Sequence, residues 1–301
     1  MSLEYRKKRI KNLSKKWKGS LANDLIMQWK IPDDLFKKFQ FAIGLYISKS
    51  MHFTFSESES EIVKLINKNR NNRLNITPNG AVVPKNEYQL EFNLVLRTWC
   101  DIVRKMTSPN PKLLNKFRLT PNIRIKFGKE IAENKKRKLD TAIPHSDAWL
   151  EGPFGLNCHV PIFGDCNKNF LHFYKLIKES NFKESFLKTA TAYNEMSWVL
   201  DYYQPDKKFK PKKGLVYLSD YALLHNTIRL PNSGLRVSID TTINSGNHKV
   251  HKDRESEYLK KIPYVGEDFF VKCNRSENDK INIKKTTFSH YTTGNLTRIN
   301  L

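Results

Sequence analysis

The chain has 301 residues, of which 39% are hydrophobic and 28% charged, and its formal net charge is +23 at pH 7. This length can bury a large core, and the composition excludes a disordered chain. No apolar run reaches the roughly 20 residues of a membrane helix, and the basic N-terminus lacks the apolar core and cleavage site of a secretory signal. We therefore expect a folded, cytoplasmic protein that does not enter a membrane.

The net charge is the one feature of the composition that suggests a partner, because a basic surface attracts nucleic acid. The basic residues are spread along the whole chain, with no Arg-rich tract and no signature of a nucleic-acid-binding module. We expect a solvated, Lys-rich surface, and we keep nucleic acid as an alternative partner. The sequence carries no signal of an oligomeric state.

Residues 1–115 predict a helical region. Apolar residues recur at spacings of three and four over residues 33–48 and 86–106, which indicates helices with one buried face. Between them, Ser58 and Glu61 have the spacing of a capping box at the start of a third helix. These apolar stripes indicate packing rather than chemistry.

From about residue 121 the apolar period changes to two, which is typical of half-buried strands. The predicted strands are residues 123–127, 156–160, 214–218, 223–228 and 235–243, with a helical insertion at 182–196 and a short helix at 254–261. Helices followed by many short strands indicate an α+β chain whose β part is a jelly roll or similar barrel. We divide this single structural domain into a helical region (1–115), a β core (116–245) and a C-terminal extension (246–301).

Three residues could form a metal site. His145 and Asp147 lie in a stretch, residues 142–150, that we interpret as extended, so both side chains project from the same face. His225, in a predicted strand, could supply a third ligand. Two histidines and one carboxylate on one face of a metal leave its other positions open, a pattern diagnostic of non-haem Fe(II) oxygenases.

A possible anion site follows His225. Arg236 comes eleven residues later, beyond a turn at residues 231–234, and Ser238 shares its strand face. A guanidinium and a hydroxyl on one face suit a carboxylate. If the two flanking strands form a hairpin, Arg229 lies opposite Arg236, which is unfavourable unless an anion lies near. Arg229 then either assists the same anion or points to solvent.

The order His145-x-Asp147, His225 and Arg236-x-Ser238 resembles the signature of the Fe(II)/2-oxoglutarate-dependent dioxygenase superfamily, over roughly residues 124–243. Residues 124–127, 143–149 and 161–165 are similar to a bacterial branch that includes a protein linked to streptomycin biosynthesis. The resemblance implies a double-stranded β-helix core with N-terminal helices packed against it. It also implies Fe(II) at the triad, 2-oxoglutarate at Arg236 and Ser238, and dioxygen as cosubstrate. Hydroxylation with release of succinate and CO2 is the implied default.

The substrate is open at this stage. We expect a small polar metabolite such as a sugar, an aminocyclitol or an amino-acid-like molecule. The alternatives are an oxygenase that demethylates nucleic acid and a non-enzymatic jelly-roll binding protein. Asn157 and His159 share a strand face and are either pocket residues or structural ones. His248 and His251 lack a third partner, so we predict no second metal site.

Overall fold

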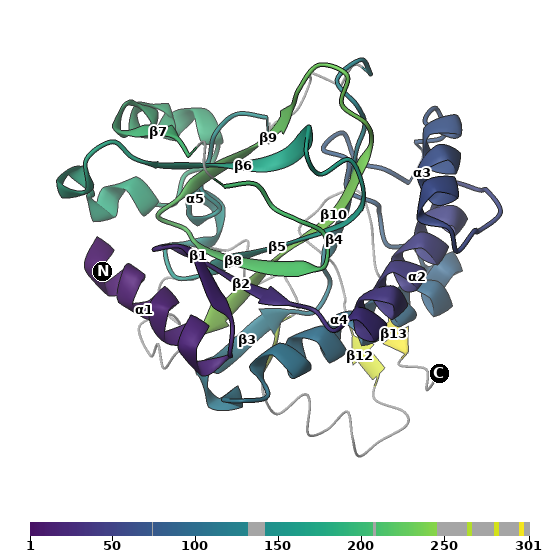
Figure 1. The fold of residues 1–301 in the computed structure, drawn as a ribbon, viewed down its shortest axis with the longest axis horizontal. Helices are drawn as coiled ribbons and strands as arrows, with labels where there is room; N and C mark the ends of the chain where they lie inside the picture. The colour runs from purple at the N-terminus through teal and green to yellow at the C-terminus, as the bar shows by residue number, and fades with distance from the viewer. Residues whose placement is uncertain are drawn as a thin grey trace.

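The computed structural model describes residues 1–73, 75–131, 142–206 and 209–245, together with three short strands beyond them (Figure 1). The helices are α1 (Leu3–Lys16), α2 (Asp33–Ser50), α3 (Glu59–Lys68), α4 (Gln89–Thr107) and α5 (Ala148–Glu151). The 3-10 helices are η1 (Asn86–Tyr88), η2 (Pro111–Leu113), η3 (Glu179–Asn181), η4 (Glu184–Leu187) and η5 (Tyr193–Tyr202). Within the described residues, no helix is both long and apolar enough to cross a membrane.

The strands form antiparallel sheets, which confirms the mixed helical and antiparallel architecture. They are β1 (Ser20–Asn23), β2 (Ile26–Lys30), β3 (Leu114–Arg118), β4 (Asn122–Lys126), β5 (Leu156–Gly164), β6 (Asn169–Leu176), β7 (Tyr203–Pro205), β8 (Leu215–Asp220), β9 (Leu224–Arg229), β10 (Arg236–Ser245), β11 (Tyr264–Gly266), β12 (Lys280–Asn282) and β13 (Asn295–Thr297). The large sheet runs β1-β2-β8-β5-β10-β3-β11, with β4 also paired to β10. A small sheet runs β7-β6-β9, and β12 pairs with β13.

The large sheet is covered on both faces. On one face, Cys158 and Val160 of β5 join the core built with α2 and α4. On the other, Tyr217 of β8 packs in a second core with Phe173 and Leu224 of the small sheet. Strand β5 is therefore buried along nearly its whole length, and the prediction of half-buried strands is wrong there. The alternation turns Asn157 and His159 away from the helices and toward the small sheet.

The N-terminal third differs from the predicted, wholly helical region. Strands β1 and β2 lie within it, and β2 pairs with β8, so residues 20–30 extend the large sheet. Helix α1 lies within the predicted helical region, but its residues were not singled out, because its buried positions include two arginines, Arg6 and Arg9, and not only apolar residues. An apolar periodicity cannot detect a helix whose inner face carries charged side chains.

Helices α2, α3 and α4 confirm the predicted helices in position, but the capping box does not form. The Ser58 side chain makes no capping bond and lies 3.0 Å from the Ser60 hydroxyl. The predicted helical insertion at 182–196 contains instead two 3-10 helices, η4 and the start of η5. The predicted helix at 254–261 and the pair His248 and His251 lie outside the described residues.

The predicted hairpin between the strands of His225 and Arg236 is wrong. Strand β9 pairs with β6 in the small sheet, whereas β10 pairs with β5, β4 and β3 in the large one. The turn between them carries the chain from one sheet to the other (Figure 1). Sequence alone identified both strands and the turn, but a turn signal does not tell which partner each strand takes.

A buried ion pair attaches α1 to the large sheet. Arg6 Nη1 lies 2.9 Å from Asp220 Oδ1 at the end of β8, and both side chains are almost fully buried. We expect Arg6→Ala to lower the free energy of unfolding by about 3 kcal/mol, because the buried Asp220 carboxylate then keeps only Arg9, at 3.7 Å, as a cation among the described residues, beside the Ala222 N–H that donates to it at 2.9 Å. Urea unfolding measures this loss, and an unchanged midpoint would contradict the structural role given to the pair.

Candidate metal centre

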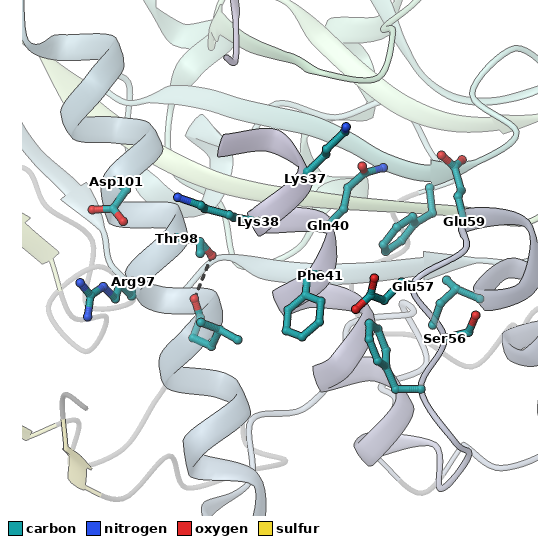
Figure 2. A pocket seen from close by; sticks show the side chains of 14 residues that line it. Lys37, Lys38, Gln40, Phe41, Ser56, Glu57, Glu59, Arg97, Thr98 and Asp101 are labelled. Atoms are coloured by element: carbon teal, nitrogen blue, oxygen red, sulfur yellow. Dashed lines mark hydrogen bonds between the residues drawn. The ribbon is translucent and has the colours of Figure 1, made fainter. Parts of the chain in front are cut away.

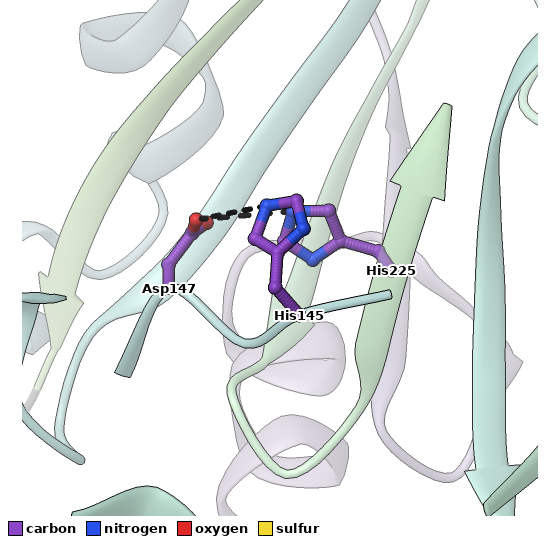
Figure 3. A group of neighbouring side chains, drawn as sticks. All are labelled: His145, Asp147 and His225. Atoms are coloured by element: carbon purple, nitrogen blue, oxygen red, sulfur yellow. Dashed lines mark ion pairs between the residues drawn. The ribbon is translucent and has the colours of Figure 1, made fainter. Parts of the chain in front are cut away.

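The three predicted metal ligands lie together between the two sheets (Figure 3). Asp147 Oδ1 is 4.0 Å from His145 Nε2 and 3.8 Å from His225 Nε2, and the candidate ligand atoms all lie within 4.8 Å of one another. The backbones of the two histidines are paired: each N–H donates to the other's carbonyl, at 3.0 and 2.8 Å. This bridge fixes the separation of the two imidazoles.

Asp147 reaches the site by a route that the sequence pattern did not indicate. The prediction that residues 142–150 are extended is wrong from Asp147 onward, because that residue has helical backbone angles and is the N-cap of α5. The side chain of Ser146 points away and donates to the Tyr221 carbonyl at 2.8 Å. The carboxylate is therefore brought to the histidines by a turn into a short helix, not by strand alternation.

The environment of the two histidines keeps them neutral. Burial, followed by the proximity of His225, lowers the pKa of His145 to about 3, and burial lowers the pKa of His225 to about 4. His145 Nδ1 lies 2.7 Å from the Ile143 carbonyl, a bond that places the ring proton there and leaves the Nε2 lone pair toward Asp147. Neutral imidazoles with an exposed lone pair are the form that binds a metal.

The carboxylate is oriented by a second residue. Asn157 Nδ2 donates to Asp147 Oδ2 at 2.6 Å, so Oδ1 faces the imidazoles. Burial raises the pKa of Asp147, and this bond together with the nearby His145 opposes the rise. The ring of Tyr193 stacks on His145 with centroids 4.3 Å apart. The site thus offers two nitrogens and one oxygen, and hydrogen bonds with neighbouring groups orient His145 and Asp147. This ligand set fits a divalent transition metal such as Fe(II).

Removing Asn157, the hydrogen-bond partner of Asp147, should weaken metal binding without abolishing it. We expect Asn157→Ala to lower Fe(II) affinity about 10–100-fold, the usual cost of losing such a partner, because the carboxylate becomes free to rotate. Anaerobic titration with Fe(II) measures the affinity. Thermal unfolding of the metal-free protein serves as a check that the fold persists, and an unaltered affinity would show that Asn157 does not orient Asp147.

Two further polar groups border the triad, and sequence reasoning missed both. Glu151 accepts from Tyr221 and from Thr242, at 2.6 and 2.7 Å, and burial together with Asp147 raises its pKa to about 7. Arg124 Nε donates to Asp240 Oδ2 at 2.8 Å. Arg124 lay at a polar position of a predicted strand and in the segment 124–127 of the resemblance, but no role had been predicted for it.

Arg236 and Ser238 lie in β10 with 2% and 1% of their surface exposed. The register places Lys126 of β4 directly opposite Arg236, and Arg124 opposite Ser238, so all four side chains share one face. Lys126, also 2% exposed, thus occupies the position that we had predicted for Arg229. Two buried cations in directly opposed positions are unfavourable unless an anion lies near them.

Arg229 has a different environment. It lies opposite Asn169 in the small sheet, and its Nη1 donates to the carbonyls of Gly128 and Ile131, at 3.0 and 2.9 Å. These bonds attach the segment after β4 to the small sheet. The predicted position opposite Arg236 is therefore wrong.

A cavity of about 710 Å³ opens elsewhere, among α2, α3 and α4 (Figure 2). It adjoins Phe163, which belongs to the helix-covered face of the large sheet, and its rim carries charges of both signs, including Lys37, Arg97, Glu57 and Asp101. It brings no metal-binding group together among the described residues. Chemistry, not volume, identifies the candidate site.

No protein-family model and no curated protein matches this chain. Among solved structures, an N-substituted L-amino acid dioxygenase from Burkholderia ambifaria is similar at 13% identity, with 77% of this chain and 85% of that chain covered and a TM-score of 0.37. AviO1 from Streptomyces viridochromogenes is similar at 10% identity, 78% and 94% coverage and a TM-score of 0.40. A non-haem α-ketoglutarate-dependent epimerase, SnoN of nogalamycin biosynthesis, gives 10% identity, 78% and 81% coverage and a TM-score of 0.36. Because these TM-scores lie below 0.5, the assignment below rests on the residues of the site.

Proposed function

We propose that the protein is a non-haem Fe(II)- and 2-oxoglutarate-dependent oxygenase. The observation that carries the proposal is the convergence of His145, Asp147 and His225, with ligand atoms within 4.8 Å of one another. A two-histidine, one-carboxylate set of this kind leaves coordination positions open for a bidentate cosubstrate and dioxygen. The two facing antiparallel sheets are consistent with a double-stranded β-helix core, which forms part of the proposal.

The chain supplies separate groups for the metal and for the cosubstrate. His145, Asp147 and His225 would hold Fe(II). Arg236 and Ser238 would bind the distal carboxylate of 2-oxoglutarate, and Lys126, opposite Arg236, would share its charge. When bound, Fe(II), 2-oxoglutarate and dioxygen supply oxidation of a substrate coupled to release of succinate and CO2. The protein residues orient these groups and exclude water.

His159 supports the spatial relation between the two groups. Burial, then the nearby Arg236 guanidinium and then His225 lower its pKa well below the usual value. His159 is thus influenced by both Arg236 and His225, which supports one ligand reaching from the metal ligands to Arg236. We keep Arg229 outside the cosubstrate site, because its Nη1 donates to the backbone carbonyls of Gly128 and Ile131.

We further propose hydroxylation of a small polar metabolite in the cytoplasm, on the resemblance of residues 143–149 and 161–165 to the bacterial biosynthetic branch. The net charge of +23 is the observation that favours a nucleic-acid substrate instead. A binding measurement distinguishes the two functions. An oxygenase that acts on nucleic acid should bind DNA or RNA with an affinity that falls steeply as the salt concentration rises. Absence of such binding would remove that alternative.

Reconstitution without oxygen tests the proposed class directly. Protein mixed with Fe(II) and 2-oxoglutarate should bind one of each and show the visible absorption band of their chelate. After oxygen is admitted, it should release succinate, faster when a substrate is present. Failure to bind Fe(II) would favour a non-enzymatic binding protein.

A further inference from the structure

Three acceptor atoms without a hydrogen-bond partner among the described residues lie on one side of the candidate metal centre. They are Asn157 Oδ1, His159 Nε2 and Asp240 Oδ1, and each atom is buried. Asn157 and His159 are 5% and 2% exposed. A buried polar atom with no partner costs free energy, so a group of such atoms indicates a ligand that would satisfy them.

The three residues form one continuous surface, which we call the acceptor ledge. Asn157 and His159 are two residues apart in β5, and Asp240 lies opposite His159 in β10. Their neighbours Cys158, Val160 and Ile239 belong to the core on the helical side. The ledge therefore faces the small sheet, which carries His225.

The ledge adjoins the metal ligands. The other side of the Asn157 amide donates to Asp147. The side chains of Asp147 and Asp240 are 22% and 25% exposed, so the edge of the ledge reaches the surface, whereas its three acceptor atoms are buried.

Each of these atoms accepts and does not donate. The neutral His159 ring bonds to the Ile239 backbone through its other nitrogen, in a contact that favours a proton there, so Nε2 carries the lone pair. Asp240 Oδ2 is occupied by Arg124, which leaves Oδ1 turned away from that guanidinium. A carboxylate ligand, itself only an acceptor, has nothing to offer this surface.

We propose that the acceptor ledge binds the primary substrate through its O–H or N–H groups, so that the substrate is a hydroxylated or amino-substituted molecule and not one presenting a carboxylate here. This inference rests on the proposed function, because it takes the triad as the reaction centre. Asp240 and Asn157 are then the residues that determine specificity. Arg124 acts as a positioning residue that holds the Asp240 carboxylate.

Relaxation of small probes by Mn(II) bound at the triad tests the proposal, because a paramagnetic ion speeds the relaxation of protons held near it. Three probes share a six-membered ring: trans-cyclohexane-1,2-diol, trans-2-aminocyclohexanol and cyclohexanecarboxylate. With Mn(II) and 2-oxoglutarate bound, we expect the proton relaxation rates of the diol and the amino alcohol to be enhanced at least about tenfold more than those of the carboxylate. Two hydrogen bonds to the ledge would give a difference of this size. Equal enhancements, a larger one for the carboxylate, or none for any probe would overturn the proposal.

Asp240→Asn removes the negative charge but keeps one oxygen that can accept a hydrogen bond from Arg124. Its amide oxygen should accept from Arg124, which turns the NH2 group inward where Oδ1 had been. The diol enhancement should then fall about tenfold, and the carboxylate enhancement should rise. Asp201→Asn, at an exposed carboxylate, is the matched control and should change neither. An unaltered probe preference in Asp240→Asn would contradict the ledge, whereas failure of the wild type to bind Mn(II) would contradict the proposed function.

Discussion

His225→Ala should remove bound Fe(II) and 2-oxoglutarate turnover together. The triad offers one ligand atom from each residue, so the variant leaves a two-ligand site. The loss of affinity should exceed the roughly 10–100-fold expected when only an outer partner such as Asn157 is removed. Metal content after anaerobic reconstitution and gel filtration measures the first effect, and succinate release measures the second.

A matched control comes from the neighbouring strand of the same sheet. His172 of β6 lies opposite Asn226, one position away from the Phe173–His225 pair, so it faces away from the triad. His172→Ala should therefore bind Fe(II) and release succinate as the wild type does. Normal turnover in His225→Ala would remove the metal centre from the proposal, whatever its stability.

The sequence predicted the candidate ligands because their chemistry is readable from residue type. Two histidines and an aspartate are needed, and few residues of these types stand in positions that strands could bring together. The pairing of the strands could not be predicted from the sequence. Residues 223–228 and 235–243 flank a turn, and a hairpin was the local solution, yet each strand pairs better in a separate sheet where both of its faces are covered.

That error has a consequence for the cosubstrate site. A hairpin would have placed Arg229 beside Arg236, whereas the observed register places Lys126 there, from a strand about 100 positions earlier. Glu151, which borders the triad, and Asp240, the partner of Arg124 there, were likewise missed. Their positions depend on a short helix and on a long-range strand pair, neither of which leaves a periodic signal.

The second large effect is expected at Arg236. Arg236→Met should raise the dissociation constant for 2-oxoglutarate about 10²–10³-fold, because two charge-assisted hydrogen bonds to the distal carboxylate would be lost. Fe(II) binding should persist, since Arg236 is not a metal ligand. This variant should therefore lose 2-oxoglutarate binding and keep Fe(II) binding, whereas His225→Ala should lose both.

Thermal and chemical unfolding provide a readout that does not depend on turnover. A ligand at 100 times its dissociation constant stabilises the folded protein by about 2.7 kcal/mol, and a 100-fold weaker one at the same concentration by about 0.4 kcal/mol. The Fe(II)-loaded wild type should show the first value on addition of 2-oxoglutarate, and Arg236→Met the second or less. Equal stabilisation of both proteins would place the distal carboxylate elsewhere.

Lys126 tests whether the opposed cations act on one anion. Lys126→Met should weaken 2-oxoglutarate binding about tenfold, less than Arg236→Met, because a single ammonium lacks the two-pronged geometry of a guanidinium. If both cations contact the same carboxylate, the double variant should lose less affinity than the sum of the two single losses, since each single change already removes part of a shared interaction. Strict additivity would instead assign Lys126 a role separate from the carboxylate. The cross-strand register of β4 and β10 predicts coupling, because it holds the two side chains on one face in directly opposed positions.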